Sequence, residues 1–231
     1  MKFKEQAIEE AINWWIHDEY YYHNVFSNLE KAIDEMSIEF ISNAVFSMFL
    51  KQYSVRRSLK AGVNTPRSFL KEIMDEGFYK SVKNGKTNQI DELHDKFDSA
   101  SNNSVKSALS KFSALCNPSK FIMYDTRSRK GMHYILNNEI KERATYKEID
   151  CYESYCKFAI EVSKEYRDQE LDRALDHVKS DFRANFLIQN KDAFKLRVVD
   201  KLCWLHGMDA VGDGVMEYNL GDYYRLMEYR K

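Results

Sequence analysis

The chain has little proline and glycine, with two prolines and eight glycines among 231 residues. Strands are joined by turns, and turns depend on these two residue types, so their scarcity favours helices over sheets. No apolar run approaches the roughly 20 residues of a membrane span, and the opening stretch MKFKEQAIEE lacks the apolar core of a signal peptide. We therefore expect a soluble, cytoplasmic protein with no membrane contact.

Cysteine is also sparse, and its spacing argues against a metal site. The four cysteines are Cys116, Cys151, Cys156 and Cys203. They form no C-x-x-C motif, and no histidine stands at a spacing that completes a zinc site. This excludes a structural zinc or iron–sulfur cluster of the usual kind, so we predict buried free thiols, no metal and no cofactor.

The net charge of −1 hides an uneven distribution along the chain. Acidic residues dominate the first 50 positions, whereas positions 104–131 hold one acid, Asp125, among six basic residues: Lys106, Lys111, Lys120, Arg127, Arg129 and Lys130. Positions 51–60 add Lys51, Arg56, Arg57 and Lys60 without an acid. Clustered Lys and Arg suit contacts with phosphates, so these stretches indicate a polyanion surface. Solvated helix faces are the alternative.

Apolar spacing predicts an all-α fold whose helices are mostly about 10–20 residues long. The expected helices cover 38–60 (as one or two), 66 to near Gly77, 88–98, a helix that follows the polar turn 99–104 and runs through about 116, and stretches around 155–166 and 196–203. Thr65 and Pro66 are a helix-start signal, as N-cap and first helical residue. Gly207 is expected to end the last helix.

The stretch 104–136 is the part of the sequence most suggestive of chemistry. A polar turn precedes a helix with two lysines, Asn117-Pro118 ends that helix, and an apolar segment leads to Asp125 at the start of the next helix. Asp is a preferred N-cap, and the first-turn amides of a helix favour its ionised form. A fixed carboxylate can also stabilise the cation that develops when a glycosidic bond breaks. From these residues alone, Asp125 is either a plain cap or a catalytic carboxylate.

This order of elements resembles the helix-hairpin-helix DNA glycosylase superfamily. In that family a lysine follows the hairpin, and the essential Asp lies 18 or 19 positions later; Lys106 lies 19 residues before Asp125. The pattern formed by Ser110, Lys111, Pro118, Phe121, Asp125 and Arg127 is similar to a divergent 8-oxoguanine-glycosylase-like branch, in which Lys111 is the matching lysine. The segment LRVVDKLCWLHG (196–207) resembles a further element of that branch.

The resemblance implies a single glycosylase-like unit, 1–231, made of two helical subdomains with an active-site cleft between them. One subdomain covers about 30–124 and includes the hairpin-like turn; the other combines 1–29 with 125–231. Asp125 is the expected catalytic residue, with Lys106 or Lys111 as a lysine nucleophile. Because these lysines are five residues apart, they lie ~140° apart around a helix and cannot both face the cleft.

The implied partner is duplex DNA, bound by a monomer that flips a damaged or modified base into a pocket. The residues expected to contact DNA are Asn102, Asn103, Ser104, Arg127, Arg129, Lys130 and Arg56. The turn has no Gly-x-Gly, so Asn102, Asn103 and Ser104 would have to replace it. Gln52, Tyr53, Tyr124 and Trp204 are expected to wall the base pocket. Oxidised purines and phage-type modified pyrimidines both remain possible bases. The alternative is a non-catalytic helical module that binds DNA or a protein.

Overall fold

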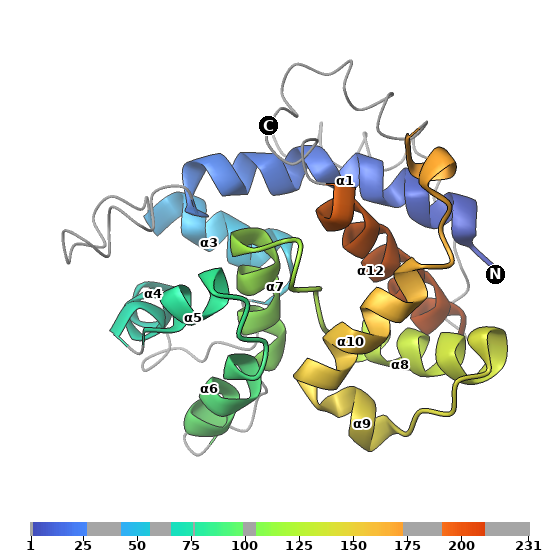
Figure 1. The fold of residues 1–231 in the computed structure, drawn as a ribbon. Helices are drawn as coiled ribbons and strands as arrows, with labels where there is room; N and C mark the ends of the chain where they lie inside the picture. The colour runs from blue at the N-terminus through green and yellow to red at the C-terminus, as the bar shows by residue number, and fades with distance from the viewer. Residues whose placement is uncertain are drawn as a thin grey trace.

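The computed structural model describes residues 2–26, 43–55, 66–75, 77–98, 105–172 and 191–210. Throughout these ranges the regular secondary structure is helical, without a strand. The predicted all-α class is therefore confirmed for the described part of the chain (Figure 1).

A first group of helices packs together on one side of the molecule. It consists of α3 (Asn43–Gln52), α4 (Pro66–Asp75), α5 (Phe78–Lys83), α6 (Gln89–Asp98) and α7 (Lys106–Cys116). In this group α4 contacts α3 and α5, while α7 packs on α5 and α6. Figure 1 shows them beside a long N-terminal helix, α1 (Lys4–Asn24), which crosses the top of the molecule.

A second group follows an extended segment that leaves the end of α7. It consists of α8 (Thr126–Tyr134), the π-helix η4 (Ile135–Ile140), α9 (Tyr146–Asp150), α10 (Tyr152–Ser163) and α12 (Lys191–Ala210). Helix α12 packs along α8, α10 and α1. Because α1 also contacts α3 and α7, it joins the two groups.

Several predicted helix boundaries match the structure because they depend on local signals. Helix α4 begins at Pro66 and ends at Asp75, just before Gly77, and Asn117 follows the last residue of α7. Thr65, the predicted N-cap, lies outside the described residues. The six-residue helix α5 was not predicted; it begins after Gly77, whose φ of 64° is in the left-handed region that suits glycine.

The prediction that Gly207 ends a helix is wrong, because α12 continues to Ala210. Gly207 instead allows two helices to approach closely: a β-carbon there would lie 2.0 Å from the backbone oxygen of Arg127 in α8. Gly131 of α8 has the reciprocal role, since its β-carbon would lie 1.7 Å from the backbone oxygen of Cys203. Helices α8 and α12 therefore meet backbone to backbone at two glycines.

The cysteine prediction holds in part. All four thiols are free, and Cys116, Cys156 and Cys203 are buried, but Cys151 is exposed. Cys151 stands at the junction between α9 and α10, where the backbone is extended, and this places it at the surface.

Candidate functional site

Asp125 is the N-cap of α8, as its sequence context predicts. Its Oδ1 accepts hydrogen bonds from the backbone amides of Arg127 (3.0 Å) and Ser128 (2.9 Å) and from the Ser128 hydroxyl (3.0 Å). Burial opposes ionisation of this carboxyl, but Lys111 and the Ser128 hydrogen bonds outweigh it and hold its pKa below the usual value. The other oxygen, Oδ2, is the one that Lys111 reaches.

The structure places Lys111, and not Lys106, beside Asp125. Lys111 Nζ lies 3.3 Å from Asp125 Oδ2 and donates a hydrogen bond to the Tyr53 carbonyl at 2.9 Å. The Lys111 side chain is 9% exposed and that of Asp125 is 28% exposed, so solvent reaches the carboxylate more easily than the amine.

Lys106 points to a different part of the surface of α7. Its Nζ lies 2.5 Å from Asp91 Oδ1 and donates to the Asp150 carbonyl at 2.7 Å. The two lysines lie in different surroundings, as their five-residue separation requires. Lys106 therefore has the spacing from Asp125 that the glycosylase family shows, but its side chain contacts Asp91 and the Asp150 carbonyl and not Asp125.

The extended segment ahead of Asp125 is fixed from both sides. The Ser110 hydroxyl of α7 donates to the Tyr124 carbonyl (3.2 Å) and accepts from the Tyr124 amide (3.0 Å). From α10, the Tyr152 hydroxyl donates to the Ile122 carbonyl (2.5 Å). Because these buried backbone groups are paired, the chain enters α8 in one position, and Asp125 is held with it.

A buried ionic cluster lies next to this pair and was not predicted. Arg197 of α12 places Nε 2.7 Å from Asp18 Oδ2 and Nη1 2.6 Å from Asp200 Oδ2. The Tyr53 hydroxyl donates to Asp18 from the end of α3. The cluster thus joins α1, α3 and α12, and through the Tyr53 carbonyl it reaches Lys111.

The electrostatics of the cluster follow from its burial. Desolvation raises the pKa of Asp200, although Arg197 and Lys201 oppose the shift; the charges of Asp125 and Lys111 also act on it. Desolvation and Asp18 likewise raise the pKa of Tyr53, so its hydroxyl stays protonated and donates. Of these residues, Arg197 and Asp200 lie in the stretch 196–207 that resembles an element of the glycosylase branch. Asp18 is one acidic residue among aromatic ones and carries no sequence signal for this role.

The residues expected to contact DNA are only partly within the structure's described ranges. Arg56, Asn102, Asn103 and Ser104 lie outside them. Arg127 is exposed, and its guanidinium carbon lies 5.6 Å from the centroid of the Trp204 ring. Arg129 pairs with Asp150 at 2.9 Å, and Lys130 is half-buried on the same helix.

The four residues expected to wall the base pocket have different surroundings among the described residues. Tyr53 is buried against Asp18, and the Tyr124 hydroxyl donates to Asp150 at 3.0 Å; burial raises the Tyr124 pKa. Gln52 and Trp204 are half-buried. Three of the four lie beside Asp125 or its direct neighbours: Tyr124 precedes Asp125 in the chain, the Tyr53 carbonyl accepts from Lys111, and Trp204 contacts Arg127 in the first turn of α8.

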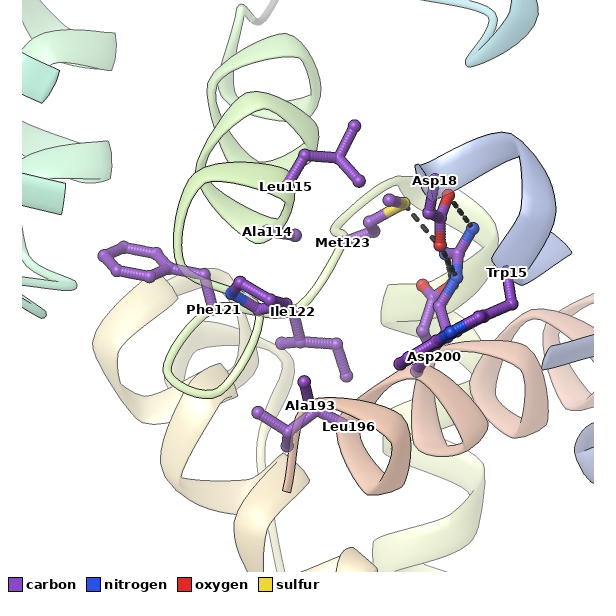
Figure 2. A pocket seen from close by; sticks show the side chains of 12 residues that line it. Trp15, Asp18, Ala114, Leu115, Phe121, Ile122, Met123, Ala193, Leu196 and Asp200 are labelled. Carbon is purple, nitrogen blue, oxygen red and sulfur yellow. Dashed lines mark hydrogen bonds and ion pairs between the residues drawn. The ribbon is translucent and has the colours of Figure 1, made fainter. Parts of the chain in front are cut away.

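A small cavity lies elsewhere, between α1, α7 and α12 (Figure 2). Its volume of about 20 Å³ suffices for roughly one water molecule and not for a base. Figure 2 shows Asp18 and Asp200, with Trp15 beside them, on one side of the cavity and Ala114, Leu115 and Phe121 on the other. This cavity adjoins the ionic cluster, and none of the four residues expected to wall the base pocket lines it.

Within the described ranges, no group of three or more His, Cys, Asp and Glu side chains could hold a metal ion. None of the helices there is long and apolar enough to span a bilayer. Comparison with protein-family models, curated proteins and solved structures finds no match to this chain.

Proposed function

We propose that the chain is a DNA N-glycosylase of the helix-hairpin-helix type, in which Asp125 stabilises the positive charge that develops at the sugar C1′. The single observation that carries this proposal is the geometry of Asp125: an ionised carboxylate, fixed at a helix N-terminus and 28% exposed, next to a buried lysine. Such a carboxylate stabilises an oxocarbenium-like transition state without having to reorganise.

The roles of the two carboxylate oxygens support this mechanism. Oδ1 is occupied by three hydrogen bonds within α8, so it orients the group. Oδ2 meets only the long 3.3 Å contact with Lys111 among the described residues, and it is the oxygen able to face a sugar. The capping hydrogen bonds therefore serve the proposed chemistry, because they aim the carboxylate and keep it charged.

Binding of DNA is assigned to the surface around the first turn of α8. Arg127 and Lys130 lie on this helix, and Arg127 covers Trp204 of α12. Arginine suits phosphate contacts, and a half-buried indole offers a face on which an extruded base can stack. In this proposal the substrate enters between the α3–α7 group and the α8–α12 group, where Asp125 begins the second.

The experiment is a screen for abasic sites on duplexes with single modified bases, including oxidised purines and phage-type modified pyrimidines. Wild type should release at least one base, and Asp125→Asn should lose nearly all of this activity while it still binds the same duplex. If wild type leaves no abasic site on any duplex of the panel, the glycosylase proposal is wrong.

A second candidate is a non-catalytic helical module that binds DNA or a protein partner. The observation that favours it is that Asp125 already has a complete structural role, as the cap of α8 and the partner of Lys111. In that case Asp125→Asn lowers the melting temperature, while wild type releases no base. If added salt does not weaken the binding of DNA, the protein has no phosphate-contacting surface in either candidate function.

A further inference from the structure

Lys201 differs from the other basic side chains near the candidate site. Lys106 pairs with Asp91, Lys111 with Asp125, and Arg197 with Asp18 and Asp200. Lys201 is 8% exposed, yet no ion pair joins it to a carboxylate in the described part of the chain. The Trp14 ring, 4.2 Å from Nζ, favours the ammonium form, but desolvation of the buried amine outweighs it and lowers its pKa.

The surroundings of Lys201 come from two helices. On α1, the centroid of the Trp14 ring lies 4.2 Å from Lys201 Nζ. The titratable groups on the same face of α1 are Glu10, His17 and Asp18. On α12 itself, Arg197 stands one turn earlier and Asp200 is adjacent. Burial and then the Arg197 charge lower the Lys201 pKa to about 8, against the opposing pull of Asp200, Asp18 and Glu10. About a tenth of Lys201 is thus free amine at pH 7.

Lys201 lies on α12 between two residues that reach the candidate site. Its neighbour Asp200 is acted on by the charges of both Asp125 and Lys111, and Trp204, three residues later, contacts Arg127. Lys111, by contrast, donates to a carboxylate and a carbonyl, which are partners for an ammonium. A nucleophilic lysine needs desolvation or a cationic neighbour, and Lys201 has both.

We propose that Lys201 is a reactive amine that forms an imine with an aldehyde carbon. The neutral Nζ adds to the carbonyl carbon, the oxygen leaves as water with the two nitrogen-bound hydrogens, and a C=N bond replaces the C=O bond. Under the proposed glycosylase function, on which this part rests, the aldehyde is C1′ of a ring-opened abasic deoxyribose. Lys201, and not Lys111, then carries the covalent adduct.

The first test needs no DNA. The full chain is treated at pH 7 with limiting formaldehyde and cyanoborohydride, and methylated lysines are mapped by mass spectrometry. Lys201 should react at least about tenfold faster than the exposed Lys141 and Lys147, because a pKa of about 8 leaves over about a hundredfold more free amine than the usual lysine value near 10.4, which exceeds the slowing expected from its 8% exposure. If Lys201 reacts no faster than these two, the inference is overturned.

A matched variant controls for disturbance of α12. Lys195 lies on the same helix and pairs with Asp168 at 2.7 Å, so Lys195→Gln removes an amine of the ordinary kind. This variant should leave the labelling of Lys201 unchanged. Loss of fast labelling in Lys195→Gln, with the helix content intact, would show that the reactivity does not come from the Trp14 and Arg197 surroundings and would overturn the inference.

The second test uses a duplex with one abasic site and borohydride, followed by mapping of the cross-linked peptide of wild type. An adduct on Lys201 supports the DNA part of the inference, and an adduct on Lys111 or Lys106 overturns that part. If wild type neither cross-links nor releases a base from any modified duplex, the glycosylase proposal fails. The labelling experiment still decides whether Lys201 is a reactive amine.

Discussion

Gly207 of α12 stands against the backbone carbonyl of Arg127 in α8, so close that a β-carbon at position 207 would lie 2.0 Å from that oxygen. Arg127 is in the first turn of α8, which Asp125 caps. The glycine therefore determines where the helix that carries the candidate carboxylate rests on its neighbour.

Gly207→Ala should destabilise the protein by at least about 2 kcal/mol, because the added methyl meets backbone atoms on a second helix and cannot rotate away. Urea unfolding followed by circular dichroism measures the loss. Gly77→Ala is the control: its φ of 64° strains an alanine, but no atom lies within 4 Å of the added carbon. We expect about 1 kcal/mol there. A cost for Gly207→Ala no larger than the control would mean that α8 and α12 lie further apart.

Asp125 should make stability depend on acid pH. Its folded pKa is below the usual value, so its contribution is complete above about pH 4 and is lost as pH falls through the folded pKa. Wild type should therefore lose stability more steeply than Asp125→Asn between about pH 4 and pH 2, when both are unfolded thermally at a series of pH values. Parallel curves for the two proteins would contradict the ionised, capped state of Asp125.

Local signals explain why the α8 end of the site was predictable. An Asp after an apolar segment predicts an N-cap, and Asp125 is one; Pro66 at the start of α4 is a signal of the same kind. These features need only a few neighbouring residues. The partner of Asp125 is not a local feature: the family resemblance implied Lys106 or Lys111, and their five-residue separation meant that only one of them could face the cleft.

The choice between the lysines depends on tertiary contacts. Lys111 is selected because the end of α3 brings the Tyr53 carbonyl to it, while Asp91 of α6 engages Lys106. The pairing of Asp18 with Arg197 spans 179 positions, so no sequence pattern reveals it. In the sequence, a glycine that ends a helix looks the same as a glycine that lets two helices pack closely. Gly207 is of the second kind because α8 lies against it.

Arg197 should be among the costliest residues to replace. Arg197→Met leaves the carboxylates of Asp18 and Asp200 buried without their guanidinium partner, and removal of one member of a buried pair costs about 3–5 kcal/mol. Denaturant unfolding of the variant measures this. The matched control is Arg143→Met, an exposed arginine, for which we expect a change within about 0.5 kcal/mol. Equal effects of the two substitutions would mean that the cluster is hydrated and not buried.

Lys201 should make the stability of the protein rise with pH in the alkaline range, whereas a lysine in an ion pair makes stability fall there. Its folded pKa of about 8 is below its unfolded value, so between about pH 8 and 10 the unfolded chain binds more protons than the folded chain. The stability of wild type should therefore rise with pH relative to Lys201→Met, by up to roughly 1.4 kcal/mol per pH unit. Taking the difference between the two proteins removes the contribution of the buried tyrosines, whose raised pKa values act in the other direction. A difference that stays constant from pH 7 to pH 10 would show that the amine keeps its ordinary pKa, and the neutral form on which its reactivity depends would not be populated.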